Sequence, residues 1–191
     1  LEASGAEIAY VMPSHQYPLG TVMPIKRRLE LLKWADGSER RYIVEDDYDS
    51  EFRYKGKPIP ALQGYDSHGK VIYIGTFSKS IAPAIRVSYL VLPEKLLRLY
   101  EERGTAFSST VSRVDQRIVA GFLKEGYYER HLNKMRAVYK SRHDVLLDGL
   151  KEITDIEVSG ENTGVHLLVR FRNGKTEAEA CAQAKQAGIH V

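Results

Sequence analysis

The chain has 191 residues, with 28 Lys and Arg against 25 Asp and Glu, which gives a net charge of +3. This mild and well-mixed charge argues against a nucleic-acid-binding surface, and no apolar run approaches the roughly 20 residues that a membrane helix needs. The single cysteine, Cys181, leaves no disulfide framework and fits a reducing compartment. We therefore expect a cytoplasmic globular protein with no membrane segment and a real hydrophobic core.

In the first half of the chain, short apolar strands alternate with helices. The expected strands are 8–12, 42–44, 71–74 and 87–92, and the expected helices are 25–35 and 94–102. The helices show apolar residues at helical spacing, whereas the strands are short and continuously apolar. This pattern indicates an α/β architecture whose sheet is covered on both faces.

The second half is mainly helical and then changes to a helix–strand–strand–helix order. The expected elements are helices 112–124 and 127–153, strands 156–158 and 165–171, and helix 176–187. We expect residues 1–111 to form part of a large α/β domain and residues 112–153 to provide linking helices. Residues 154–191 would then begin a smaller α+β domain that is incomplete here, because both ends of the chain read as cut from something longer.

Lys79 follows the expected third strand in a turn rich in hydroxyl groups. In open α/β sheets, ligands bind outside the carboxyl ends of the strands, and a lysine amine there can form a Schiff base with a carbonyl cofactor. The hydroxyls of Thr76 and Ser78 could donate hydrogen bonds to a phosphate, and the planar guanidinium of Arg86 could pair with it. The alternative for Lys79 is an ordinary solvated surface lysine.

Asp46 and Tyr48 follow the neighbouring strand. A carboxylate at Asp46 would favour a protonated pyridine nitrogen, and the phenol of Tyr48 could donate to a ring oxygen. Asp46 and Asp47 should point to opposite sides of an extended segment, so they are not a paired acid/base device. No metal site is expected, because His15 and His166 have no further ligands at metal-binding spacing.

Four separated motifs carry a resemblance to known families. The run Thr76–Lys79, followed by Pro83, Arg86, Tyr89 and Pro93, resembles the lysine segment of fold-type I pyridoxal-phosphate enzymes. Residues 13–20, 45–54 and 127–136 are similar to the MocR branch of the GntR regulators. That branch joins an N-terminal winged helix-turn-helix to an aminotransferase-like domain. The resemblance implies a partial fold-type I large domain with a mixed, mostly parallel sheet, and the start of a smaller α+β domain.

The resemblance also assigns roles and partners. It implies pyridoxal 5'-phosphate as cofactor, with roles for Lys79 (Schiff base), Asp46 (pyridinium partner), Tyr48 (phenolate-oxygen contact) and Arg86 (phosphate), beside which lie Thr76 and Ser78. The effector would be an amine or amino acid such as GABA, which displaces Lys79. A homodimer would complete the site. DNA would be reached only through the winged helix-turn-helix, which is absent from this chain.

Two other functions remain open at this point. A pyridoxal-phosphate-dependent aminotransferase would use the same cofactor on an amino acid and a 2-oxo acid, with the lysine as proton shuttle. Aminotransferases commonly place an Asn-Pro pair where this chain has Tyr17-Pro18, which argues against efficient transamination. A dimerisation module with a vestigial site is the third possibility. The segment 56–60 is expected to be a plain turn-rich connection.

Overall fold

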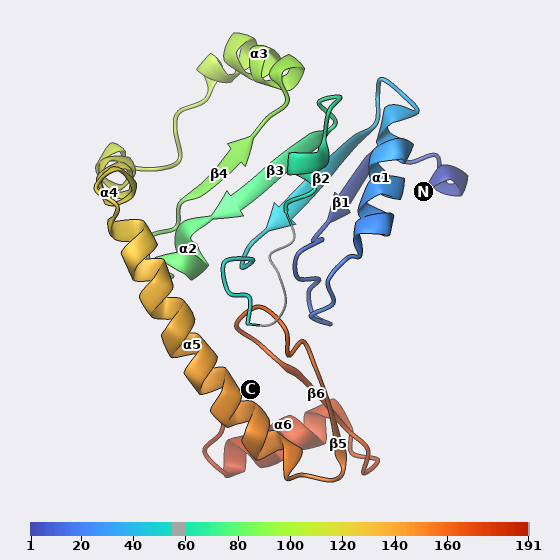
Figure 1. Cartoon of the computed structure of the whole chain (residues 1–191), viewed down its shortest axis with the longest axis vertical. Helices are drawn as coiled ribbons and strands as arrows, with labels where there is room; N and C mark the ends of the chain where they lie inside the picture. Colours follow the sequence, from blue (N-terminus) through green and yellow to red (C-terminus); the bar gives the residue numbers. More distant parts are fainter. Residues whose placement is uncertain (55–59, 191) are drawn as a thin grey trace.

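The computed structural model of the chain describes residues 1–54 and 60–190, so most of the expected turn-rich connection at 56–60 lies outside the described residues. Its centre is a four-stranded sheet in the order β1-β2-β3-β4 (Figure 1). The strands are Ile8–Val11, Tyr42–Asp47, Val71–Thr76 and Ser88–Val91. The first three run parallel and β4 runs antiparallel to β3. The expected α/β class with a mixed, mostly parallel sheet is confirmed.

Helix α1, Ile25–Asp36, covers one face of this sheet and forms the main hydrophobic core with it. The core residues are Ala9, Leu31, Leu32, Trp34, Ala35, Ile43, Leu62 and Val71. Apolar residues repeat on one side of α1 because positions three and four apart share a helix face. Burying each leucine stabilises the fold by about 1.5–3 kcal/mol relative to leaving it exposed.

The opposite face of the sheet is apolar but open. Ile8 and Tyr10 alternate with the buried Ala9 and are 64% and 56% exposed, and Leu90 on β4 is 55% exposed. The expectation of two covered faces is therefore met on one face only. A continuously apolar strand indicates that both sides tend to be buried, but it does not say which residues cover them.

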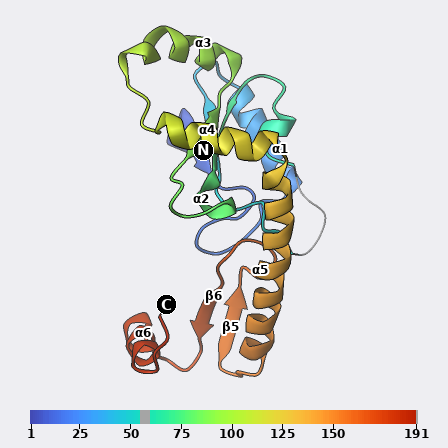
Figure 2. The ribbon, with the colours of Figure 1, turned by 90° about the vertical axis from the view of Figure 1, so that its left-hand side faces the viewer.

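Helices dominate the remainder of the chain. They are α3 (Glu94–Arg103), α4 (Arg113–Lys124), α5 (Tyr127–Lys151) and α6 (Glu177–Gln186), and the one-turn α2 (Phe77–Ser80) follows β3. Short 3-10 turns lie at Glu2–Ser4, Gln63–Tyr65 and Gly104–Ala106. Helix α5 runs from beside α2 to a separate hairpin (Figures 1 and 2). None of the described helices is long and apolar enough to cross a membrane.

The hairpin consists of the antiparallel strands β5, Ile156–Ser159, and β6, Leu168–Phe171. Residues that link these strands attach to residues 48–54, which follow β2 and are called the strap below. The Gly164 amide donates to the Phe52 carbonyl at 2.7 Å, and the Tyr54 amide donates to the Asn162 carbonyl at 3.0 Å. The strap therefore ties the hairpin to the sheet.

Gly20 lies at a second close approach between these two parts, and it provides a stability test. Its φ is +69°, and a Cβ there would lie 2.3 Å from the Cα of Gly160. We expect Gly20→Ala to destabilise the chain by about 2 kcal/mol or more, because a left-handed conformation costs a non-glycine residue about 1–2 kcal/mol and the backbone must also shift.

Gly121 is the matched control, since it lies in α4 and a Cβ there meets nothing within 4 Å. Gly121→Ala should stabilise the chain by about 0.5–1 kcal/mol. Urea unfolding of both variants gives the comparison. Equal unfolding free energies for the two would contradict the close approach at Gly20.

Candidate functional site

The residues expected to hold a cofactor lie where β2 and β3 end. Asp46 is in β2 and pairs in register with Ile74 of β3, so the ends of the two parallel strands lie side by side. Tyr48 follows β2 directly, while Thr76 closes β3 and opens α2. Strand β2 is longer than expected and includes Asp46 and Asp47 themselves. The backbone at Asp46 is therefore held in place by its pairing with β3.

Thr76 shapes the turn that presents Lys79. Its Oγ1 accepts a hydrogen bond from the Ser78 amide at 3.2 Å, which caps the N-terminus of α2. The same hydroxyl donates to the Val87 carbonyl at 3.3 Å. The Thr76 hydroxyl proton is thus already used within the chain. It positions the turn, whereas Ser78 keeps its own hydroxyl proton for a ligand.

Lys79 and Arg86 supply the positive charge of the site. Lys79 is exposed, and its amine has no hydrogen-bond or ion-pair partner among the described residues. Arg86 is also exposed, and its Nη1 lies 3.5 Å from the Ser78 Oγ. The φ of Arg86 is 49°, a left-handed conformation that costs a non-glycine residue about 1–2 kcal/mol. Such strained residues cluster at ligand-binding sites, and a guanidinium there suits a phosphate.

Tyr10 is a neighbour of the site that the sequence analysis missed. Its hydroxyl donates a short hydrogen bond to the Asp46 carboxylate, which raises the pKa of Tyr10 to about 12. Tyr10 pairs with Val44 in the parallel register, and Val44 shares a sheet face with Asp46. Only the strand pairing could have revealed this contact, because 36 residues separate the two side chains in sequence.

Tyr48 lies beside a buried histidine. Its hydroxyl is 3.2 Å from Nδ1 of His15. Burial, followed by the nearby carboxylates of Asp49 and Asp46, raises the pKa of Tyr48 well above its usual range. The phenol therefore keeps its proton and can donate a hydrogen bond to a ligand oxygen.

The two adjacent aspartates point to opposite sides of β2, as the strand alternation predicted. Asp47 is buried on the α1 side, where its Oδ2 accepts from the Tyr73 hydroxyl at 2.8 Å and from the Ser50 hydroxyl at 2.7 Å. Asp46 faces the other side and is only half-buried. Asp47 is thus structural, and Asp46 alone faces the candidate site.

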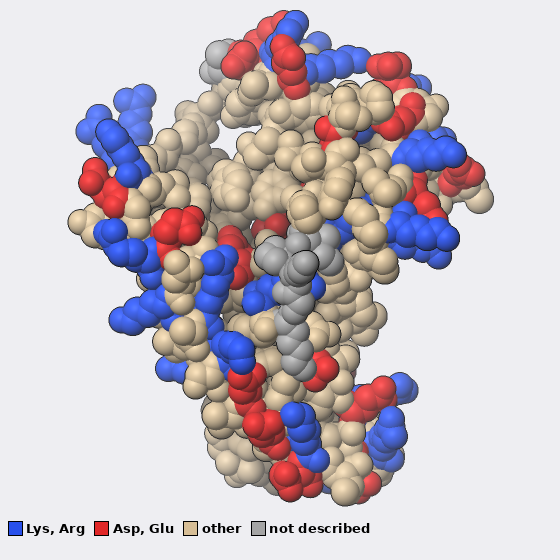
Figure 3. Space-filling view, viewed as in Figure 1, with Lys and Arg blue, Asp and Glu red and all other residues tan. Residues whose placement is uncertain are grey.

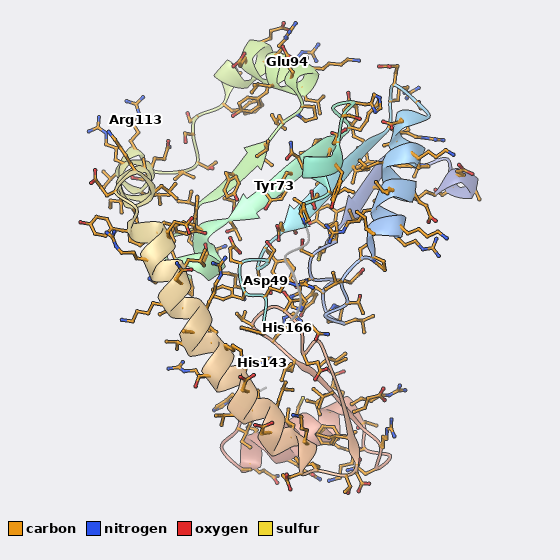
Figure 4. All side chains as sticks on the ribbon, viewed as in Figure 1. Asp49, Tyr73, Glu94, Arg113, His143 and His166 are labelled. Carbon is orange, nitrogen blue, oxygen red and sulfur yellow. The ribbon has the colours of Figure 1, made fainter. Side chains whose placement is uncertain are left out.

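The strap connects this site to α5. Glu51 accepts a hydrogen bond from the Tyr128 hydroxyl at 3.5 Å, and its carbonyl accepts from Nε of Arg136 at 2.7 Å. Burial raises the pKa of Glu51. Farther along, the ring of Tyr54 lies 4.5 Å from the ring of His143, whose position on α5 is labelled in Figure 4. Only a few residues therefore separate Tyr48 from the contacts of the strap with α5.

The donor set fits one side of a pyridoxal-phosphate site. The structure brings together a carboxylate for a ring nitrogen, a protonated phenol, a free amine, and a guanidinium with a hydroxyl for a phosphate. The site is accessible to solvent, since Lys79 and Arg86 are exposed and Asp46 is only half-buried. On the face shown in Figure 3, basic and acidic side chains are interspersed.

Comparison with known proteins supports this interpretation. The family model for aminotransferase class I and II matches residues 4–191. An uncharacterized HTH-type transcriptional regulator of Bacillus subtilis (strain 168), YdeL, is 42% identical over 96% of this chain and 40% of its own length. The probable rhizopine catabolism regulatory protein MocR of Rhizobium meliloti is 34% identical over 96% of this chain and 37% of its own length.

Among solved structures, the multiple substrate aminotransferase from Thermococcus profundus superposes with a TM-score of 0.86 at 30% identity. It covers 100% of this chain, which corresponds to 48% of the aminotransferase. The chain thus spans about 40% of the length of these regulators and about half of the enzyme. The aminotransferase shares the fold of this chain over its whole length. The chain belongs to the aminotransferase class I and II family.

Proposed function

We propose that this chain is part of the effector-sensing domain of a MocR-type transcription regulator that binds pyridoxal phosphate. The regulators YdeL and MocR match nearly the whole chain, at 42% and 34% identity. The observation that carries the proposal is the strap, because it begins at Tyr48 and contacts both α5 and the hairpin. A sensor needs such a connection from its ligand site to the rest of the molecule.

Each proposed site residue has a definite task. Pyridoxal phosphate, when bound, supplies an aldehyde that reacts reversibly with amines. Lys79 offers the amine that holds it, and Asp46 keeps a positive charge on the ring nitrogen through charge attraction. Tyr48 donates its proton to the ring oxygen. Arg86 and Ser78 bind the phosphate, and Thr76 holds the turn in place.

An amine or amino-acid effector would compete with Lys79 for the cofactor. We propose that release of the lysine shifts the turn at 76–79 and the adjacent Tyr48. The strap would then pass the change to α5 and so from the large-domain part, 1–111, through the linking helices, 112–153, to the small-domain part, 154–191. A GABA-sensing, GabR-like member fits this chemistry, because GABA carries the required primary amine.

Partners follow from the same proposal. We propose a homodimer in which the second subunit completes the open side of the cofactor site. DNA would be bound by a helix-turn-helix elsewhere in the full-length protein, since the charges on the viewed face of this chain are mixed (Figure 3). A cytoplasmic location fits a regulator of this kind.

A true aminotransferase is the second candidate, supported by the full coverage of this chain by the Thermococcus profundus enzyme. The discriminating residue is Tyr17, which lies next to the cis peptide bond before Pro18 where aminotransferases commonly carry Asn. Tyr17 is 62% exposed, and its ring lies 5.6 Å from the His166 ring between centroids, tilted by 58°. Tyrosine has no side-chain amide. Of the residues that we assign to the site, Tyr48 is therefore the one that donates a hydrogen bond to the ring oxygen of the cofactor.

Operator binding tests the sensor proposal. The full-length protein, loaded with pyridoxal phosphate, should change its affinity for its own promoter region by at least about fivefold when a recognised amine, GABA among those tried, is added. Amines that lack a primary amino group serve as controls. A protein that turned over amino donors at about 1 per second or faster, with no change in DNA affinity, would be an enzyme instead.

A further inference from the structure

Three side chains far apart in sequence meet where the hairpin joins the sheet. His15 belongs to the loop after β1. Asp49 belongs to the strap and His166 to the segment just before β6, and both are labelled in Figure 4. One ligand atom from each lies within 4.8 Å of the other two. We propose that His15, His166 and Asp49 form a site for a divalent transition-metal ion such as Zn²⁺. Sequence spacing had argued against a metal here, because no two of these residues are close in sequence.

His15 is held in the orientation that a metal ligand needs. Its Nδ1 lies 2.8 and 2.9 Å from the two carboxylate oxygens of Asp49, and both side chains are 1% exposed. An Nδ1–H that donates to Asp49 leaves the lone pair on Nε2. That buried Nε2 has no hydrogen-bond partner among the described residues. A carboxylate that orients the far side of an imidazole is the usual outer partner of a metal-binding histidine.

His166 completes the pair in the same way. Its Nε2 lies 3.2 Å from the Pro18 carbonyl, to which an Nε2–H donates, so the lone pair remains on Nδ1. The two imidazole rings are 4.6 Å apart between centroids. Zinc–nitrogen bonds are about 2.0–2.1 Å, which places two ligand atoms roughly 3.3 Å apart in a tetrahedral site. The ligand atoms of the cluster lie within 4.8 Å of one another, so binding requires the half-buried His166 to rotate until its Nδ1 faces the Nε2 of His15.

The backbone leaves room for the imidazole only because glycine surrounds it. A Cβ at Gly164 would lie 2.0 Å from Cε1 of His15 and 2.7 Å from Oδ2 of Asp49. A Cβ at Gly20 would lie 3.2 Å from Nε2 of His15. The main chain at Gly20 and at Gly164 therefore packs directly against His15, at the place where the hairpin contacts the sheet.

The ligand types select the metal. Two imidazoles, one of them backed by a carboxylate, suit Zn²⁺, Co²⁺ or Ni²⁺ more than Mg²⁺ or Ca²⁺, which prefer all-oxygen sites. Asp49 orients His15 through Nδ1, the two histidines are the protein ligands, and water fills the remaining positions. Because His166 belongs to the hairpin and His15 to the sheet, a bound ion would clamp these two parts together. The inference does not depend on the cofactor proposal.

Metal titration of the 191-residue chain tests the site. Chain freed of metal with a chelator should bind one Co²⁺, with visible bands typical of four- or five-coordination, and Zn²⁺ should displace it. His166→Gln should weaken binding at least tenfold, since even outer partners are worth about 10–100-fold. His68→Gln, an exposed histidine near Asp36, is the matched control and should bind as the wild type does.

Heat stability gives a second readout. Zn²⁺ should raise the melting temperature of the wild type and of His68→Gln but not that of His166→Gln, because an ion that binds only the folded state stabilises it. Circular dichroism checks that His166→Gln is folded, and His15→Gln provides a second ligand variant. Absence of saturable binding to the wild type, or binding unchanged in both ligand variants, would overturn the proposal.

Discussion

Lys79→Ala should abolish the visible absorption band of protein-bound pyridoxal phosphate in the full-length protein. The amine of Lys79 is exposed and has no partner among the described residues, so it is free to react with a carbonyl. Its removal takes away the only amine placed by the Thr76-capped turn. The variant should also lose its response to amine effectors, while its DNA-binding part remains intact.

The control for this experiment is another exposed lysine. Lys95→Ala removes an exposed amine on α3 that forms a surface ion pair with Glu39, at 3.4 Å. Its absorption spectrum should match that of the wild type. A band that persists in Lys79→Ala would show that a different lysine holds the cofactor.

Arg28→Met should destabilise the 191-residue chain by about 3–5 kcal/mol, because it removes one partner of a buried polar cluster. Arg28 lies in the first turn of α1 and is 0% exposed. Its guanidinium donates to the carbonyls of Pro13 and Pro60 at 2.8 Å and of Met23 at 3.0 Å. Methionine keeps the apolar stem but leaves the three carbonyls, one buried and two partly buried, without this donor.

The loop that carries His15 depends on the same arginine. Pro13 and Met23 flank this loop, so Arg28 clamps both of its ends. Urea unfolding measures the loss, with Arg27→Met as the control. Arg27 is exposed and pairs only with Glu30 on the same helix, so its removal should cost at most about 0.5 kcal/mol. Similar losses for both variants would contradict the clamp.

The order and type of the helices and strands were predictable from local patterns. Apolar periodicity placed α1, α3, α4 and α5 within a few residues of their observed bounds. Strand β2 was expected to end at Val44, yet it continues to Asp47. The acidic residues looked like a loop, but their strand neighbours in β3 supply the hydrogen bonds that extend it.

The site residues were predictable in part, because several of them lie at the ends of neighbouring strands. Asp46, Tyr48, Thr76, Ser78, Lys79 and Arg86 follow strands that are adjacent in sequence, so a strand-end argument places them together. Tyr10 and the His15–Asp49–His166 cluster were not found. In sequence, Tyr10 lies 36 residues from Asp46, His15 lies 34 residues from Asp49, and His166 lies 148 residues from Pro18, which it contacts. No local sequence pattern records such contacts.

Local sequence patterns also could not predict which face of the sheet is covered by a helix. Ile8, Tyr10 and Leu90 read as buried strand residues, yet they are exposed on the face opposite α1. Similarly, the Thr76 hydroxyl was expected to face a phosphate, but it donates to the Val87 carbonyl. Where a hydroxyl proton points depends on a backbone partner 11 residues away, and sequence spacing does not show that partner.

One measurement tests most directly whether this site senses amines or catalyses their conversion. The full-length protein, loaded with pyridoxal phosphate, is mixed with an amine such as GABA and a 2-oxo acid, and both the cofactor absorption and the formation of product are followed. The sensor account predicts a saturable spectral change with product formation far below about 1 per second. Sustained turnover at or above that rate would contradict it.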